Sequence, residues 1–105
     1  MQTTELQKVA SQVRRDILRQ VHGCQSGHPG GSLGCTDLLV ELYFNSMNLK
    51  SNSAGKVEFQ MNGLNEDVFF LSNGHISPLL YSVLARRGYF QVSELATFRK
   101  LNTRL

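Results

Sequence analysis

The chain has 105 residues, of which 41% are hydrophobic and 18% are charged, with a formal net charge of +3. This composition, without low-complexity tracts, excludes a disordered chain and allows one small core. The positive residues are scattered along the chain and do not form a basic cluster, so we expect neither a nucleic acid nor a membrane as partner.

The N-terminal region predicts a helix over residues 5–22. Its apolar residues recur at helical spacing, and they are Leu6, Val9, Ala10, Val13, Ile17 and Val21. Thr4 with Gln7 forms a capping box in this interpretation. A loop over 23–32 follows, and then a helix from about 34 to 47 that carries apolar residues on nearly every face. We therefore expect this second helix to be buried on most sides.

Residues 48–66 are polar and irregular, which is typical of an exposed loop without a chemical role. The alternation of Val57, Phe59 and Met61 before Asn62-Gly63 allows a short hairpin into 66–71. The apolar run 68–71 predicts a buried strand of a parallel sheet.

A further helix is expected from Pro78, and a last one from near Ser93 through Leu101. One strand cannot complete a sheet by itself. We therefore expect the isolated chain to self-associate or to remain partly unfolded, because several apolar residues would lack packing partners. These apolar residues are Leu38, Leu39, Leu42, Phe69 and Phe70.

Two glycine-rich turns each carry one histidine and lead toward a helix. The first reads Ser-Gly-His-Pro-Gly-Gly-Ser-Leu-Gly over residues 26–34, and the second reads Leu-Ser-Asn-Gly-His over 71–75. Glycine lets backbone approach a ligand closely, and helix N-termini suit phosphate groups. The alternative interpretation is a pair of ordinary loops with solvated histidines, because short glycine motifs often occur by chance.

Two cysteines, Cys24 and Cys35, flank the first turn. A zinc site could recruit them with His22 and His28, but the spacing lacks the pairs that are usual in structural zinc sites. No secretory signal precedes them, so we expect a reducing cytoplasm in which both thiols are packed or idle and form no disulfide.

The order of these motifs resembles the transketolases over almost the full length. Ser-Gly-His-Pro-Gly is followed by an apolar helix, Leu-Ser-Asn-Gly-His, Leu-Tyr-Ser-Val-Leu at 80–84, Gly-Tyr at 88–89 and Phe-Arg-Lys-Leu at 98–101. The related deoxyxylulose phosphate synthases carry a Gly-Gly-His-Leu-Gly version of the first motif instead. The resemblance implies thiamine diphosphate as cofactor and transfer of a two-carbon ketol unit from a ketose phosphate to an aldose phosphate.

The resemblance also implies roles for individual residues. His28 matches the histidine that faces the thiazolium and the reacting end of the sugar, and His75 matches the histidine near the diphosphate. Both are the expected catalytic residues. The expected cofactor-binding residues are His75 with Gly74 and Asn73 in the second turn, and Ser26 and Gly27 in the first.

The implied fold is α/β, with residues 1–105 as an incomplete N-terminal part of the diphosphate-binding domain, mainly helical with one or a few short strands. In the family a further Gly-His-Pro turn with another active-site histidine and a Gly-Asp-Gly metal segment follow, and neither is in this sequence. We therefore expect Mg²⁺ or another divalent cation to be held by residues outside this chain, and this chain alone to be inactive.

The expected partners are sugar phosphates, the remainder of a transketolase or a companion subunit, and a second copy in a homodimer. The competing hypothesis is a non-catalytic module that binds a phosphate or serves as a helical interaction domain.

Overall fold

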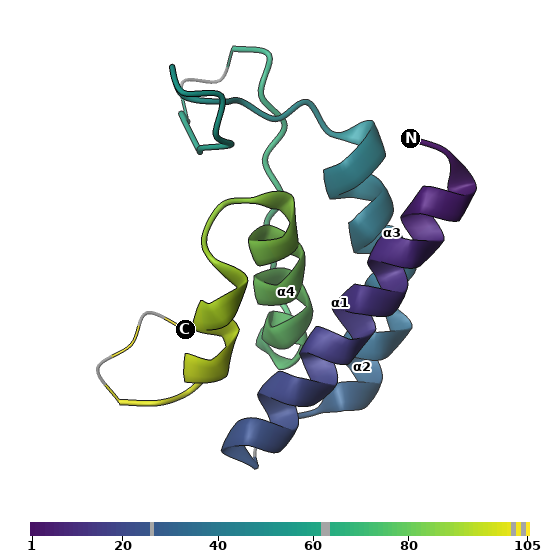
Figure 1. Cartoon of the computed structure of the whole chain (residues 1–105), viewed down its shortest axis with the longest axis vertical. Coiled ribbons are helices and arrows are strands. Elements are labelled where there is room, and N and C mark those ends of the chain that lie inside the picture. The colour runs from purple at the N-terminus through teal and green to yellow at the C-terminus, as the bar shows by residue number, and fades with distance from the viewer. Residues whose placement is uncertain (26, 62–63, 102, 104) are drawn as a thin grey trace.

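The computed structural model describes residues 1–25, 27–61, 64–101, 103 and 105. Four α-helices dominate: α1 (Thr3–Cys24), α2 (Pro29–Gly34), α3 (Thr36–Glu41) and α4 (Ser77–Arg87). A π-helical turn, η1 (Leu42–Ser46), extends α3, a 3₁₀ turn, η2 (Gly74–Ile76), precedes α4, and a second 3₁₀ segment, η3 (Val92–Thr97), follows it. Figure 1 shows α1 and α4 as the two long helices, with α2 and α3 alongside α1.

The predicted first helix is confirmed, and it is two residues longer at each end than the periodicity indicated. The capping box is wrong. Gln2 is the N-cap residue and no side chain caps the helix, because the chain becomes helical at Thr3 and so places Thr4 inside the first turn. At the other end Gln25 adopts the left-handed conformation, and its backbone N–H donates to the carbonyl of His22, which terminates α1.

The predicted second helix is present but is divided into α2, α3 and η1. The loop expected over 23–32 is wrong in its second half, since α2 already begins at Pro29, whose fixed φ suits a first helical turn. Burial on most sides is also wrong in part. The side of this helical run that carries Leu38 faces away from the core, and Leu38 is 64% exposed.

The predicted buried strand at 68–71 is wrong. No strand is present among the described residues, which hold only one isolated antiparallel bridge, between Ser51 and Val57. Residues 68–71 form no regular element and have no strand partner among the described residues, and Phe70 is 89% exposed. A strand needs a second backbone for its N–H and C=O groups, and none lies beside it in the described chain. The mainly helical character is confirmed, whereas an α/β sheet stays a prediction.

The predicted hairpin into 66–71 is not formed among the described residues, and its expected turn at Asn62-Gly63 lies outside them. The carboxylate of Glu66 accepts hydrogen bonds from the backbone N–H groups of Gln60 and Met61, at 3.0 and 2.7 Å. Side-chain capping of the backbone thus replaces the ladder that a hairpin would form. Figure 1 shows this part of the chain, on either side of residues 62–63, extending beyond one end of the helices.

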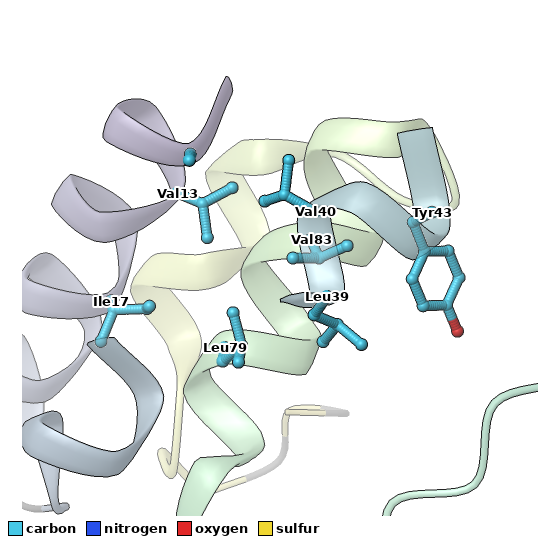
Figure 2. Packing of buried hydrophobic residues seen from close by; sticks show 8 residues of the cluster. Val13, Ile17, Leu39, Val40, Tyr43, Leu79 and Val83 are labelled. Carbon is cyan, nitrogen blue, oxygen red and sulfur yellow. The ribbon is translucent and has the colours of Figure 1, made fainter. Parts of the chain in front are cut away.

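The core lies between α1, α3, η1 and α4, and Figure 2 shows the apolar side chains that these elements contribute to it. Its fully packed members are Ala10, Val13, Ile17, Leu39, Val40, Tyr43, Leu79 and Val83. Burial of this set is the main driving force for folding. Because α1 leads into the first histidine turn and α4 follows the second, packing of these two helices brings the turns to one region.

The last predicted helix is shorter than expected. The chain forms the 3₁₀ segment η3, with Leu95 buried, and Leu101 is 90% exposed. Phe98 is buried just after this segment. No helix among the described residues is long and apolar enough to cross a membrane.

Candidate functional site

The first histidine turn depends on a glycine conformation. Gly27 has φ +114°, and a Cβ added there would lie 3.3 Å from Cγ2 of Val21. Glycine alone adopts this conformation without strain. The turn places His28 at the N-cap position of α2 in an extended conformation, with Pro29 as the first helical residue. The backbone of His28 is therefore held from both sides while its side chain remains exposed.

The second turn is organised by Asn73. Its side-chain Oδ1 accepts the backbone N–H of His75 at 3.1 Å and lies 3.2 Å from Nδ1 of the same residue. When the imidazole proton is on Nδ1, that contact is a hydrogen bond and Nε2 remains available to a ligand. The hydroxyl of Ser77 donates to the carbonyl of Gly74 at 2.7 Å and closes the turn against α4.

The two histidines come together in the tertiary structure. The ring centroids of His28 and His75 are 4.9 Å apart, and the ring planes meet at 79°, an edge-to-face arrangement. They belong to turns that are far apart in sequence and carried by different helices. The fold therefore creates one site with two imidazoles.

A cavity of about 580 Å³ opens at this pair of rings. Its described lining consists of Gly27, His28, Gly74, His75, Ser77, Pro78, Tyr81, Phe98, Arg99 and Leu105. The lining combines imidazole and hydroxyl donors with one guanidinium, and it includes no Asp or Glu among the described residues. Such a donor set fits an anionic ligand with hydroxyl groups.

Buried polar contacts hold α1 against the start of α4, next to the site. Gln20 on α1 is buried, and its Nε2 donates to the carbonyl of Pro78 at 3.0 Å and to the hydroxyl of Ser82 at 2.6 Å. Further along the same helices, Arg86 donates to the carboxylate of Asp16 through Nε and Nη2, at 2.6 and 2.8 Å. The hydrogen bond to Asp16 raises the pKa of Arg86 above its usual value. These bonds fix the register of the two helices that present the histidines.

A close contact between α2 and η2 depends on the second glycine of the Gly30-Gly31 pair. A Cβ on Gly31 would lie 3.1 Å from Cγ2 of Ile76, whereas a Cβ on Gly30 would meet nothing within 4 Å. Gly31 thus permits the close approach of the two turns. The sequence analysis did not select it, although a Gly-Gly pair beside a candidate histidine is a usable signal.

The structure brings together most of the residues selected from sequence. His28, His75, Gly27 and Gly74 line the cavity. Asn73 is not in the lining but contacts His75 directly, and Ser26 lies outside the described residues. Tyr81, Phe98 and Arg99 also line the cavity. They lie in motifs that carry the family resemblance, but no site role was predicted for them, because local sequence does not show that they are near the histidines.

The alternative metal interpretation finds no support in the geometry. Among the described residues no group of three or more His, Cys, Asp or Glu side chains could hold a metal ion. Cys24 and Cys35, which both lie in the described chain, are not joined by a disulfide.

Comparison with known proteins agrees with the chemistry of the cavity. The family profile "Transketolase, thiamine diphosphate binding domain" matches residues 5–105. The chain is 35% identical to the "6-deoxy-6-sulfo-D-fructose transketolase subunit SqwG" of Clostridium sp. (strain MSTE9), over 99% of this chain and 35% of that protein. It is 40% identical to the "Transketolase" of Buchnera aphidicola over 92% of this chain.

A similar relation holds for the "Transketolase 2" of Saccharomyces cerevisiae, which is 35% identical over 98% of this chain. The chain spans only 14% of the length of the Buchnera and yeast proteins. The similarity therefore concerns one region of much longer relatives.

Proposed function

This chain belongs to the transketolase family, and we propose that it supplies His28 and His75 to the thiamine diphosphate site of an enzyme that transfers a two-carbon ketol unit. The donor would be a ketose phosphate and the acceptor an aldose phosphate. The observation that carries the proposal is the edge-to-face pair of imidazoles at the mouth of a cavity of about 580 Å³.

The residues present fit the cofactor. A diphosphate needs hydrogen-bond donors and positive charge, and the described lining offers two imidazoles, two hydroxyls and a guanidinium, with neither Asp nor Glu. Gly74 adds no side chain to the approach, and a Cβ there would meet nothing within 4 Å. His75, Gly74 and Gly27 would hold the cofactor, with Asn73 orienting the ring of His75.

When bound, thiamine diphosphate supplies the carbanion chemistry that breaks and forms the carbon–carbon bond. The chain's own residues position groups and move protons. With the Nδ1 proton of His75 directed to Asn73, its Nε2 can accept a proton or, in the imidazolium form, donate to an anionic oxygen. His28, in edge contact with that ring, can act as a proton donor or acceptor for a substrate hydroxyl or carbonyl oxygen.

The remainder of the site would come from outside this chain. We propose that a divalent cation, Mg²⁺ or a similar ion, is held by residues of the companion part of the enzyme. One similar protein is named as a transketolase subunit, which supports a companion subunit for this chain as well. A homodimer of the complete enzyme is part of the same proposal.

Calorimetric titration of the chain with thiamine diphosphate tests the proposal, with thiamine as the ligand that lacks the diphosphate. We expect the unaltered chain to bind thiamine diphosphate more tightly than thiamine. His75→Asn should weaken binding of thiamine diphosphate by roughly 10-fold, the effect of one charge-assisted hydrogen bond. His22→Asn is the matched control, because His22 is exposed near the end of α1 and does not line the cavity.

The proposed role of His28 in proton transfer is tested through the reaction rate and not through cofactor binding. In an enzyme reconstituted with the companion part, His28→Asn should lower the rate of ketol transfer by about 10²-fold or more, in the range of general acid–base catalysis. Binding of thiamine diphosphate should change little. Failure of the unaltered chain to prefer thiamine diphosphate over thiamine would overturn the proposed function.

A further inference from the structure

Arg99 is the one formal cation among the described residues that line the cavity of His28 and His75. A phosphate group carries about 1.5 to 2 negative charges at neutral pH, and neither Asp nor Glu is among the described residues of the lining. The cavity therefore has one permanent charge available for such a group, and Arg99 carries it.

The backbone at Arg99 is held in place from within the fold. Phe98 is buried, and its ring lies edge-on to the ring of Tyr81 on α4, with centroids 6.0 Å apart. A Cβ built on Gly27 would be 4.0 Å from Cε2 of Phe98, so the same ring also lies against the first histidine turn. Packing of Phe98 between the two histidine-bearing elements thus places the next residue at the cavity wall.

The chain turns sharply at this position. Arg99 has φ +59°, in the left-handed region that non-glycine residues rarely adopt. Backbone hydrogen bonds from Phe98 to Leu95 and from Lys100 to Thr97 hold both neighbours, at 3.2 and 3.0 Å. An uncommon conformation maintained by its surroundings is found frequently at ligand sites.

The side chain of Arg99 differs in its contacts from two other arginines of the chain. Arg14 and Arg86 pair with Asp37 and Asp16, respectively. No such ion pair is formed by Arg99 within the described part of the chain, and its side chain is exposed at the cavity. A planar guanidinium presents two parallel N–H donors that match two oxygens of a phosphate.

We propose that Arg99 is the phosphate-binding residue of this cavity and recognises a phosphoryl group of the ligand whose reacting end meets His28 and His75. The assignment rests on the proposed function for the identity of that ligand. A guanidinium would bind the diphosphate of the cofactor and the phosphate of the sugar by the same contacts, so either could supply this phosphoryl group. The experiment below separates them.

Inorganic pyrophosphate is the first probe, titrated into the full chain and into the Arg99→Gln, Arg99→Lys and Lys100→Gln variants. Arg99→Gln should raise the Kd for pyrophosphate roughly 10-fold, as expected for loss of one charge-assisted contact, and Arg99→Lys should raise it less. Lys100→Gln is the matched control: it removes the same charge one residue away, at a side chain that lines a different cavity. It should change the Kd by less than about twofold, since an exposed charge outside the site is largely screened.

Titrations with thiamine diphosphate, thiamine and fructose 6-phosphate identify the source. Weaker binding of thiamine diphosphate with unchanged binding of thiamine assigns Arg99 to the cofactor diphosphate. Weaker binding of fructose 6-phosphate alone assigns it to the substrate phosphate. Circular dichroism of each variant verifies that the helices are retained.

Two results would overturn the inference, and they differ in scope. If Arg99→Gln binds every phosphate ligand as the unaltered chain does while His75→Asn loses binding, the inference about Arg99 is wrong and the proposed function stands. If the unaltered chain binds neither pyrophosphate nor thiamine diphosphate nor the sugar phosphate, both are wrong.

Discussion

In the ion pair between Asp16 and Arg86, loss of Arg86 should lower the free energy of unfolding more than loss of the charge on Asp16. Asp16 is 2% exposed, whereas the side chain of Arg86 is 29% exposed. Two hydrogen bonds join them, at 2.6 and 2.8 Å, and Arg19 approaches the same carboxylate only at 3.7 Å. Removal of Arg86 would therefore strand a buried negative charge, while removal of the charge on Asp16 would leave a guanidinium that can still reach water.

The magnitudes follow from that asymmetry. Arg86→Met keeps most of the apolar stem and should lower the free energy of unfolding by about 3–5 kcal/mol, the usual cost of breaking a buried pair from one side. Asp16→Asn keeps the shape and should cost about 1–2 kcal/mol. Since small domains are stable by only about 5–15 kcal/mol, the first change should leave the chain near unfolding.

Urea unfolding followed by circular dichroism measures these costs, with the double variant included. The double variant should be less destabilised than the sum of the single changes, because it contains no stranded carboxylate. Arg15→Met is the matched control, since Arg15 is exposed and its side chain donates a hydrogen bond to Gln12 on its own helix. A larger cost for Asp16→Asn than for Arg86→Met would refute the reasoning.

Three further predictions concern the turn, the core and the exposed apolar surface. Gly27→Ala should lower the free energy of unfolding by about 1–2 kcal/mol, because the positive φ is strained for alanine and its Cβ would crowd Val21. Gly30→Ala is the control, and it should be neutral or stabilising because a Cβ there meets nothing within 4 Å. Thermal unfolding of the two variants tests this difference. Burial raises the pKa of Tyr43 to about 12, above the value of 10.0 for an exposed tyrosine. The stability that the buried, protonated Tyr43 contributes is therefore fully present below about pH 10 and is lost as the pH rises toward 12. Tyr43→Phe should therefore reduce the alkaline loss of stability, and an unchanged dependence of unfolding on pH between 10 and 12 would contradict this. Phe70→Ser should reduce self-association in sedimentation without lowering stability, because the side chain is exposed; equal association of both proteins would show that this apolar surface is not responsible.

The periodic part of the fold could be predicted from sequence. The apolar stripe from Leu6 to Val21 requires only local spacing, and α1 was accordingly predicted to within two residues at each end. Pro78 at the start of α4 is also a local signal, because proline suits the first turn of a helix. Helix ends were less predictable, as the unused capping box at Thr4 shows.

The strand prediction failed for a non-local reason. The run 68–71 has the composition of a buried strand, but a strand forms only where a second backbone is available for pairing. In the described chain Phe69 packs against Tyr43, with ring centroids 6.3 Å apart, while Phe70 faces outward. Composition indicates the tendency of a segment, and the neighbours decide whether the ladder is formed.

The amino-acid sequence by itself determined the chemistry available at the site: two imidazoles in glycine-rich turns, and an Asn73 able to hold the ring of His75. Only the tertiary structure decided that the two rings lie 4.9 Å apart and that Arg99 shares their cavity. The physical reason is that turn conformation depends on a few adjacent residues, whereas the distance between turns depends on how α1 and α4 pack. That packing is set by apolar and polar contacts such as those of Gln20, whose partners lie far away in sequence.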